Sequence, residues 1–255
     1  MDRTEPNQVN GGYMELLLLS NSRSPGQPML AHAAEALVKF VAGRRVTFLP
    51  YALADHSEYA EAVAGALGRY EIEMTGLHTS TDPIADVRSA EVLFLGGGNT
   101  FRLLRALQSL RLVEPIRDAV LAGAGYLGAS AGTNMACPTL RTTNDMPIVE
   151  PGSFQTLDLI PFQINPHYLD PDPASRHMGE TREERLLQFL EENDVPVLGL
   201  REGSWLLVTG DGKASLGGPH SARLFERGRE PLELPAGAEL SSLLASEPRF
   251  DTPSR

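Results

Sequence analysis

The sequence predicts an α/β fold in which a mainly parallel sheet is flanked by helices on both faces. Short apolar runs alternate with segments of helical spacing, and several of these runs are followed by Gly, Ser, Asn or Pro, as is typical of buried strands. The chain has 255 residues, 42% of them hydrophobic, which is enough for one sizeable core. In such folds ligands bind beyond the carboxyl ends of the strands, so functional residues are expected there.

The first half of the chain carries the clearest alternation. The run of four leucines from Leu16 is short and is followed by Asn21, so a strand buried on both faces is expected over residues 13–20. Further strands are expected at 45–50, 71–77, 91–95 and 125–128. Helices are expected at 30–41 and 58–67, from residue 99 through 107, at 113–121, and just after Ser130.

The second half is less regular. After a polar loop at 139–150, strands are expected at 162–165 and 197–200, separated by a Pro- and Asp-rich stretch and a helix at 182–191. Short strands at 205–209, 214–216 and 222–225 are divided by glycine-containing turns, which predicts antiparallel hairpins at the edge of the sheet. We expect one domain over 13–240, with a disordered extension at 1–12 and a polar tail at 241–255.

Charge and composition exclude several functions. A net charge of −11 leaves no broad cationic surface, so nucleic acid is not an expected partner. No run approaches the roughly 18 apolar residues of a membrane-spanning helix, and the amino terminus lacks the pattern of a signal peptide. The single cysteine, Cys137, excludes an internal disulfide and agrees with a cytoplasmic protein. A homodimer remains an open alternative.

The strongest chemical signal is the sequence Gly-Ala-Ser-Ala-Gly at residues 128–132, where a strand is expected to turn into a helix. Small residues on both sides of Ser130 permit a strained turn that exposes its hydroxyl, and the N–H of Ala131 is then free to help hold an oxyanion. An ordinary strand-to-helix junction is the alternative interpretation. In this context the motif favours a nucleophilic serine.

A second glycine-rich turn, at residues 96–98, also follows a strand and ends at Asn99. Glycines there let backbone N–H groups approach a negative charge, either a phosphate or a tetrahedral oxyanion. The turn lacks both the G-x-G-x-x-G spacing and the Lys-Ser/Thr of a P-loop. Beside a serine turn, an oxyanion hole is the simpler interpretation.

A nucleophilic serine needs a base and an acid that orients it. Of the six histidines, His167 is the candidate, because it follows an expected strand at the edge where ligands gather. Two acids compete for the third position. Glu202 follows the strand at 197–200 after one residue, and Asp145 lies in the polar loop. Chain order does not decide between them, because such triads occur in several orders.

These motifs together resemble the peptidase E, or aspartyl dipeptidase, family of serine peptidases. The resemblance runs from Met14 to about Phe225. The segments that carry it are the strand at 14–22, the glycine turn at 96–101, and the residues at 130–132, 137–139, 141–149, 163–167, 179–182 and 202–203.

The resemblance implies a fold related to class I glutamine amidotransferases and hydrolysis of Asp-Xaa dipeptides without a metal or other cofactor. It implies Ser130 as nucleophile, His167 as base and Glu202 as the acid, with Asp145 as a further required acid. Gly98 and Ala131 would supply the oxyanion hole.

Recognition of the aspartyl carboxylate calls for a local guanidinium, because the chain as a whole is acidic. Arg182 is the first candidate, and the other candidates for substrate contact are Arg141 and Asn99. A cyanophycinase-like β-aspartyl peptidase and a non-catalytic ligand-binding module on the same fold are the alternative functions.

Overall fold

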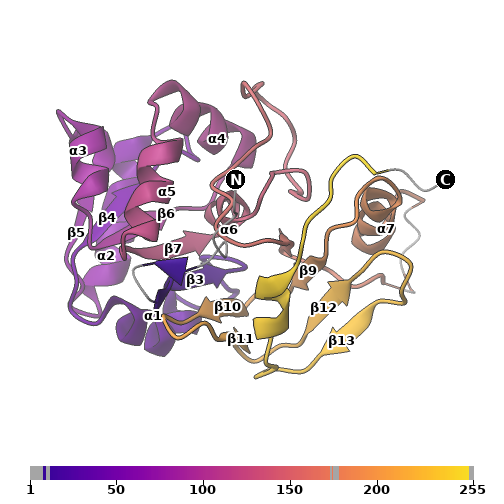
Figure 1. The fold of residues 1–255 in the computed structure, drawn as a ribbon. Helices are drawn as coiled ribbons and strands as arrows, with labels where there is room; N and C mark the ends of the chain where they lie inside the picture. The colour runs from indigo at the N-terminus through magenta and orange to yellow at the C-terminus, as the bar shows by residue number, and fades with distance from the viewer. Residues whose placement is uncertain (1–7, 10–11, 173, 175–177, 253–255) are drawn as a thin grey trace.

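The computed structural model describes residues 8–9, 12–172, 174 and 178–252. Their strands form a two-stranded, a seven-stranded and a four-stranded sheet. In Figure 1 the seven-stranded sheet and its helices lie on the left, and the four-stranded sheet with α7 lies on the right. The α/β fold with a mainly parallel sheet is confirmed.

The seven-stranded sheet has the order β11-β10-β3-β7-β6-β4-β5, and its five strands from β3 to β5 run parallel. The leucine run explains its centre. Leu16 and Leu18 pack into the hydrophobic core on one face, whereas Leu17 and Leu19 pack into the core on the other. The strands are β3 (Leu16–Leu19), β4 (Val46–Leu49), β5 (Met74–Gly76), β6 (Val92–Leu95), β7 (Gly125–Ala129), β10 (Trp205–Val208) and β11 (Ala214–Gly217).

Helices cover both faces of this sheet. The core around Leu17 and Leu19 includes buried residues of α1 and α2, and the core on the other face includes residues of α3, α4, α5 and α6. The α-helices are α1 (Ala34–Val41), α2 (His56–Gly68), α3 (Pro83–Arg88), α4 (Thr100–Ser109), α5 (Val113–Leu121), α6 (Ala131–Ala136) and α7 (Arg182–Glu192). The sequence interpretation missed α3, a six-residue helix capped by Asp82, because it is too short to show helical spacing.

The four-stranded sheet is the main difference from the expected layout. The β10–β11 hairpin extends the edge of the large sheet, because β10 pairs antiparallel with β3. Strand β12 instead pairs with β9, in the order β13-β12-β9-β8. Its strands are β8 (Gln163–Pro166), β9 (Val197–Leu200), β12 (Ala222–Phe225) and β13 (Leu232–Leu234). Strand pairing over such sequence separations is decided by tertiary packing, which local patterns do not encode.

Short regular elements lie near both ends of the chain. Strands β1 (Gln8–Val9) and β2 (Gly12–Tyr13) pair antiparallel, and the rest of the expected extension at 1–12 lies outside the described residues. The polar tail contains the short 3-10 helix η3 (Ser241–Ala245), which buries Leu243 and Leu244 in the main core. The shorter 3-10 helices are η1 (Ala31–Ala33) and η2 (Leu77–Thr79). No helix among the described residues is long and apolar enough to cross a membrane.

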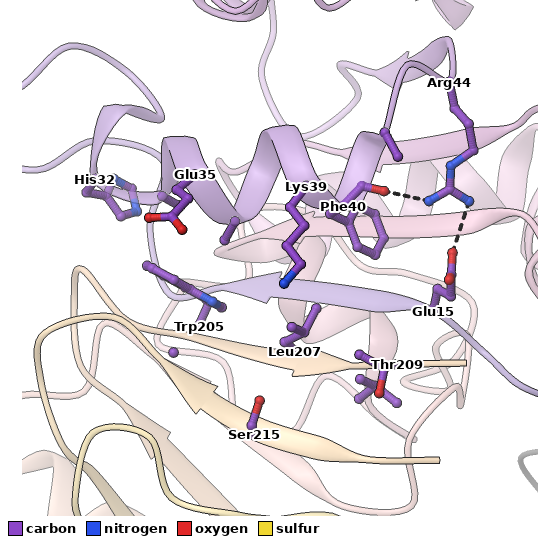
Figure 2. Close-up of a pocket in the computed structure, with 15 residues that line it drawn as sticks. Glu15, His32, Glu35, Lys39, Phe40, Arg44, Trp205, Leu207, Thr209 and Ser215 are labelled. Carbon is purple, nitrogen blue, oxygen red and sulfur yellow. Dashed lines mark hydrogen bonds and ion pairs between the residues drawn. The ribbon is translucent and has the colours of Figure 1, made fainter. Parts of the chain in front are cut away.

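A groove of about 810 Å³ lies between α1 and the β10–β11 hairpin. Figure 2 shows Lys39 extending from α1 toward Leu207, with Trp205 beside it. One end is closed by Arg44, which pairs with Glu15 at 3.0 Å. The groove is lined by apolar side chains with charged groups around them.

Candidate active site

Ser130 stands at the sharp turn between β7 and α6. Its backbone has φ 53° and ψ −107°, a strained conformation for a residue with a side chain. The turn is tight because α6 begins directly against β6. A Cβ atom on Gly132 would lie 1.9 Å from the carbonyl oxygen of Leu95, so only glycine fits there. The strained serine predicted from the Gly-x-Ser-x-Gly motif is therefore present in the structure.

His167 directly follows β8 of the four-stranded sheet and contacts this serine. Its Nε2 lies 2.8 Å from Ser130 Oγ, and its Nδ1 lies 2.5 Å from Glu202 Oε1. The backbone of His167 is also left-handed, with φ 53°. The three side chains thus form a continuous hydrogen-bonded chain from carboxylate to imidazole to hydroxyl.

Two polar residues after β3 hold this arrangement, and the sequence interpretation assigned them no role. The buried Ser20 accepts a hydrogen bond from His167 N–H at 2.9 Å and donates to the Leu200 carbonyl at 2.8 Å. The buried Asn21 accepts from the N–H of Gly203, the residue after Glu202, at 2.8 Å. Their sequence signal is a pair of polar residues directly after an apolar strand, at the carboxyl edge of the sheet.

Arg201 fixes the strand end just before Glu202. Its guanidinium contacts Asp170 at 2.6 Å and Glu233 at 2.7 Å, and only 17% of its side chain is exposed. The hydrogen bond to Asp170, with a further contribution from Glu233, raises the pKa of Arg201 above its ordinary value. Two ion pairs therefore hold Arg201, the residue between β9 and Glu202, in place.

The glycine-rich turn after β6 lies beside the serine. A Cβ atom on Gly97 would be 3.2 Å from Ser130 Cβ, so the backbone passes directly over the serine. Gly98 has φ 134°, and a Cβ atom there would lie 2.6 Å from the Ala52 carbonyl oxygen. The turn is fixed by the bond from Asn99 N–H to the same carbonyl at 3.0 Å. Gly98 and Ala131, the first residue of α6, therefore flank Ser130.

Asp145 does not contact His167 but closes another side of the site. It accepts hydrogen bonds from the backbone N–H of Thr100 at 2.7 Å and from its hydroxyl at 2.5 Å. Asn99 has both polar ends engaged, since Oδ1 accepts from Arg102 N–H and Nδ2 donates to the Met146 carbonyl. The structure therefore places Asn99 as the residue that joins the start of α4 to the loop carrying Asp145.

The two candidate arginines lie in different surroundings. Arg182, the first residue of α7, is half-buried and makes no ion pair with a described residue. Burial lowers the pKa of Arg182, the charge of Arg185 acts in the same direction, and the charge of Asp145 opposes both. Arg141 instead binds Asp251 with distances of 2.7 and 3.1 Å. In this structure Arg141 is thus paired with the carboxyl-terminal tail, and its contact with substrate stays a prediction.

The reacting groups open into a cavity of about 410 Å³. Ser130, Asp145 and His167 lie on its walls, and so does Arg23, which the sequence interpretation did not select. Cys137, at the other end of α6, is fully buried, and burial raises its pKa to about 12, so its thiol stays protonated. Within the described part of the chain, no group of three or more His, Cys, Asp or Glu side chains is placed to hold a metal ion.

Comparisons with known proteins identify the family of the chain. The profile of peptidase family S51 matches residues 16–216. A protein named peptidase E from Streptomyces coelicolor is 60% identical over 243 residues, which cover 95% of this chain and all of that protein. A protein named probable alpha-aspartyl dipeptidase from Drosophila melanogaster is 49% identical and covers 90% of this chain and 97% of its own.

The solved structures show the same fold at lower identity. A peptidase from an acI-B1 actinobacterium has a TM-score of 0.64 at 17% identity, covering 91% of this chain and 98% of its own. With the profile match spanning most of the sequence and these close relatives aligned over nearly their full length, the chain belongs to peptidase family S51.

Proposed function

We propose that this chain is a serine-type aspartyl dipeptidase that hydrolyses Asp-Xaa dipeptides through an acyl-enzyme on Ser130. The observation that carries the proposal is the chain of contacts from Glu202 through His167 to Ser130, with the serine on a strained turn. The names of the relatives, peptidase E and probable alpha-aspartyl dipeptidase, support the substrate class.

The first half of the reaction forms the acyl-enzyme. Ser130 Oγ attacks the aspartyl carbonyl carbon while His167 Nε2 takes its proton, and Glu202 stabilises the resulting imidazolium at Nδ1. The carbonyl oxygen becomes an oxyanion that the N–H groups of Gly98 and Ala131 stabilise. The tetrahedral intermediate then collapses, His167 returns the proton to the leaving nitrogen, and the second amino acid departs.

The second half releases aspartate. His167, neutral again, takes a proton from water, and the resulting hydroxide attacks the ester carbonyl. The same N–H groups stabilise the second oxyanion. When this intermediate collapses, Ser130 Oγ leaves and receives the proton from His167. All proton transfers therefore pass through Nε2.

The charges around the cavity fit an aspartyl residue with a free amino group. Both hydrogen bonds from Thr100 go to Oδ2 of Asp145. The other carboxylate oxygen, Oδ1, is therefore the one offered to the α-ammonium. Arg182 does not line the cavity itself, but its half-buried guanidinium makes no ion pair with a described residue and feels the charge of Asp145, so it is the candidate partner of the β-carboxylate. A guanidinium fits a carboxylate with two parallel hydrogen bonds.

The two alternative functions are not favoured. Relatives at 45–60% identity over 88–95% of this chain are named peptidase E or probable alpha-aspartyl dipeptidase, and none of those described here is named a cyanophycinase. A binding module without catalysis would not need the strained serine and the aligned imidazole.

The proposal is tested with Asp-Leu, Asn-Leu and N-acetyl-Asp-Leu as substrates. Ser130→Ala is expected to lower kcat for Asp-Leu by at least about 10³-fold, while Ser109→Ala, an exposed serine at the end of α4, leaves it unchanged. An organophosphate should label Ser130 in the unaltered protein. Cleavage of Asp-Leu by Ser130→Ala at the normal rate, or equal cleavage of the acetylated peptide, would contradict the mechanism or the role of Asp145.

A further inference from the structure

Arg23 is the only arginine or lysine among the described residues that line the catalytic cavity. It lies in the loop that connects β3 to η1. Its side chain is exposed and makes no ion pair or hydrogen bond with a described residue. A free guanidinium therefore stands at the cavity that holds Ser130 and His167.

The backbone at Arg23 is fixed although its side chain is free. Asn21 donates from Nδ2 to the Arg23 carbonyl at 2.6 Å, and the same Asn21 accepts from Gly203 N–H. The loop is thus tied to the segment that carries Glu202. The guanidinium of Arg23 acts electrostatically on Tyr59. Burial raises the pKa of Tyr59 to about 12, and a backbone hydrogen bond from Gly97 and the positive charge of Arg23 oppose that rise.

The wall on which Arg23 lies differs from the wall that holds Asp145. Arg23, Met29, Leu53 and Tyr59 come from the connections and helix on the α1 and α2 side of the sheet. Asp145 is bound to the start of α4, which packs on the other side. The first wall combines apolar side chains with one positive charge, and the second holds a carboxylate.

This division matches the charges of a dipeptide. An Asp-Xaa dipeptide has an α-ammonium, a β-carboxylate and a terminal carboxylate, and the proposed function uses Asp145 and Arg182 for the first two. The terminal carboxylate on the leaving residue has no partner among them. A chain of net charge −11 repels a second carboxylate at long range, so a local cation is needed to hold it.

We propose that Arg23 binds the carboxyl-terminal carboxylate of the leaving residue and thereby selects dipeptides over amidated or longer peptides. This inference rests on the proposed function and adds a specificity residue to it. Met29 and Leu53 offer apolar contacts for the side chain of the leaving residue, so Asp-Leu presents both features that this wall can bind.

The test compares Asp-Leu with Asp-Leu amide, which lacks only the terminal negative charge. Arg23→Met is expected to lower kcat/KM for Asp-Leu roughly tenfold, mainly through KM, and to change the value for the amide less than about twofold. Arg23→Lys should restore part of the loss, because an ammonium keeps the charge without the planar fork. Arg88→Met removes the same charge from an exposed position on α3 outside the cavity and should alter neither substrate.

Two results would overturn the inference. If Arg23→Met lowers both substrates by the same factor, Arg23 shapes the cavity instead of reading the carboxylate. If neither substrate changes, the guanidinium is a solvated side chain. Both outcomes are interpreted only if the unaltered protein cleaves Asp-Leu and Ser130→Ala does not. Absence of that cleavage would instead overturn the proposed function and this inference together.

Discussion

Two hollows of the molecule differ in size and in content. The groove between α1 and the β10–β11 hairpin has about twice the volume of the catalytic cavity, about 810 Å³ against about 410 Å³. In the groove, the residue with left-handed backbone is Ala42, which caps the carboxyl end of α1. An ion pair between Arg44 and Glu15 closes one end of the groove. In the cavity, the left-handed residues are Gly98, Ser130 and His167.

Volume alone therefore does not mark the reactive site. Backbone strain is retained where the surrounding structure over-determines it, and in the cavity the strained residues themselves carry the reacting groups. There the imidazole also joins two side chains from distant parts of the chain. In the groove the strain ends a helix and the charges lie around an apolar surface. The predictions below separate these two kinds of site.

The largest effect is expected for His167→Gln. Glutamine cannot accept and return the serine proton, so kcat for Asp-Leu should fall at least about 10³-fold while the protein stays folded. Steady-state kinetics with a thermal unfolding control measure this. A variant with normal kcat would show that the base is another residue. The strained residues of the cavity would then not carry the reacting groups.

Glu202→Gln should have the next largest effect, a decrease in kcat of roughly 10²-fold with little change in KM. The amide can still contact Nδ1 but does not stabilise the imidazolium. The expected loss is below that of a buried acid because 44% of the Glu202 side chain is exposed and water screens its charge.

The second acid offers a matched comparison. Asp145→Asn should raise KM more than it lowers kcat, because Asp145 bonds Thr100 and not the imidazole. If Asp145→Asn lowers kcat alone and Glu202→Gln does not, the roles of the two acids are reversed.

Arg182→Met is expected to lower kcat/KM for Asp-Leu by roughly 10- to 30-fold and to leave the weaker cleavage of Asn-Leu nearly unchanged. The reason is the loss of a charge-assisted hydrogen bond to the β-carboxylate. Arg185→Met, at an exposed position three residues later in α7, serves as the control. Equal decreases for Asp-Leu and Asn-Leu would show that Arg182 supports the structure only.

The smallest effect is expected in the groove. Lys39→Ala removes a charge that extends toward Leu207 in Figure 2 and should change kcat and KM for Asp-Leu less than about twofold. A large decrease in kcat would mean that the groove influences the site. His32 is the residue through which it could do so, because it lines the groove; burial lowers its pKa, and the Asn21 backbone and the charge of Glu202 oppose that decrease.

Much of the fold and of the reacting chain follows from local sequence. The leucine run at 16–19 has no polar face, so it requires cover on both sides, and the structure supplies it. The Gly-x-Ser-x-Gly motif predicts the strained turn because its second glycine is the only residue that fits against Leu95. His167 is indicated because it directly follows a buried strand, and Glu202 is a candidate because it lies two residues after one.

What the tertiary structure alone decided is how distant segments meet. The sequence left Glu202 and Asp145 as equal candidates, because both are acids in loops, and only the pairing of β8 with β9 places Glu202 at Nδ1. The sequence also did not show that Arg141 pairs with Asp251 of the tail, or that Arg23 lines the cavity. Local pattern specifies whether a residue lies in a strand, helix or loop, whereas the direction of a long side chain depends on the charges that other segments bring to it.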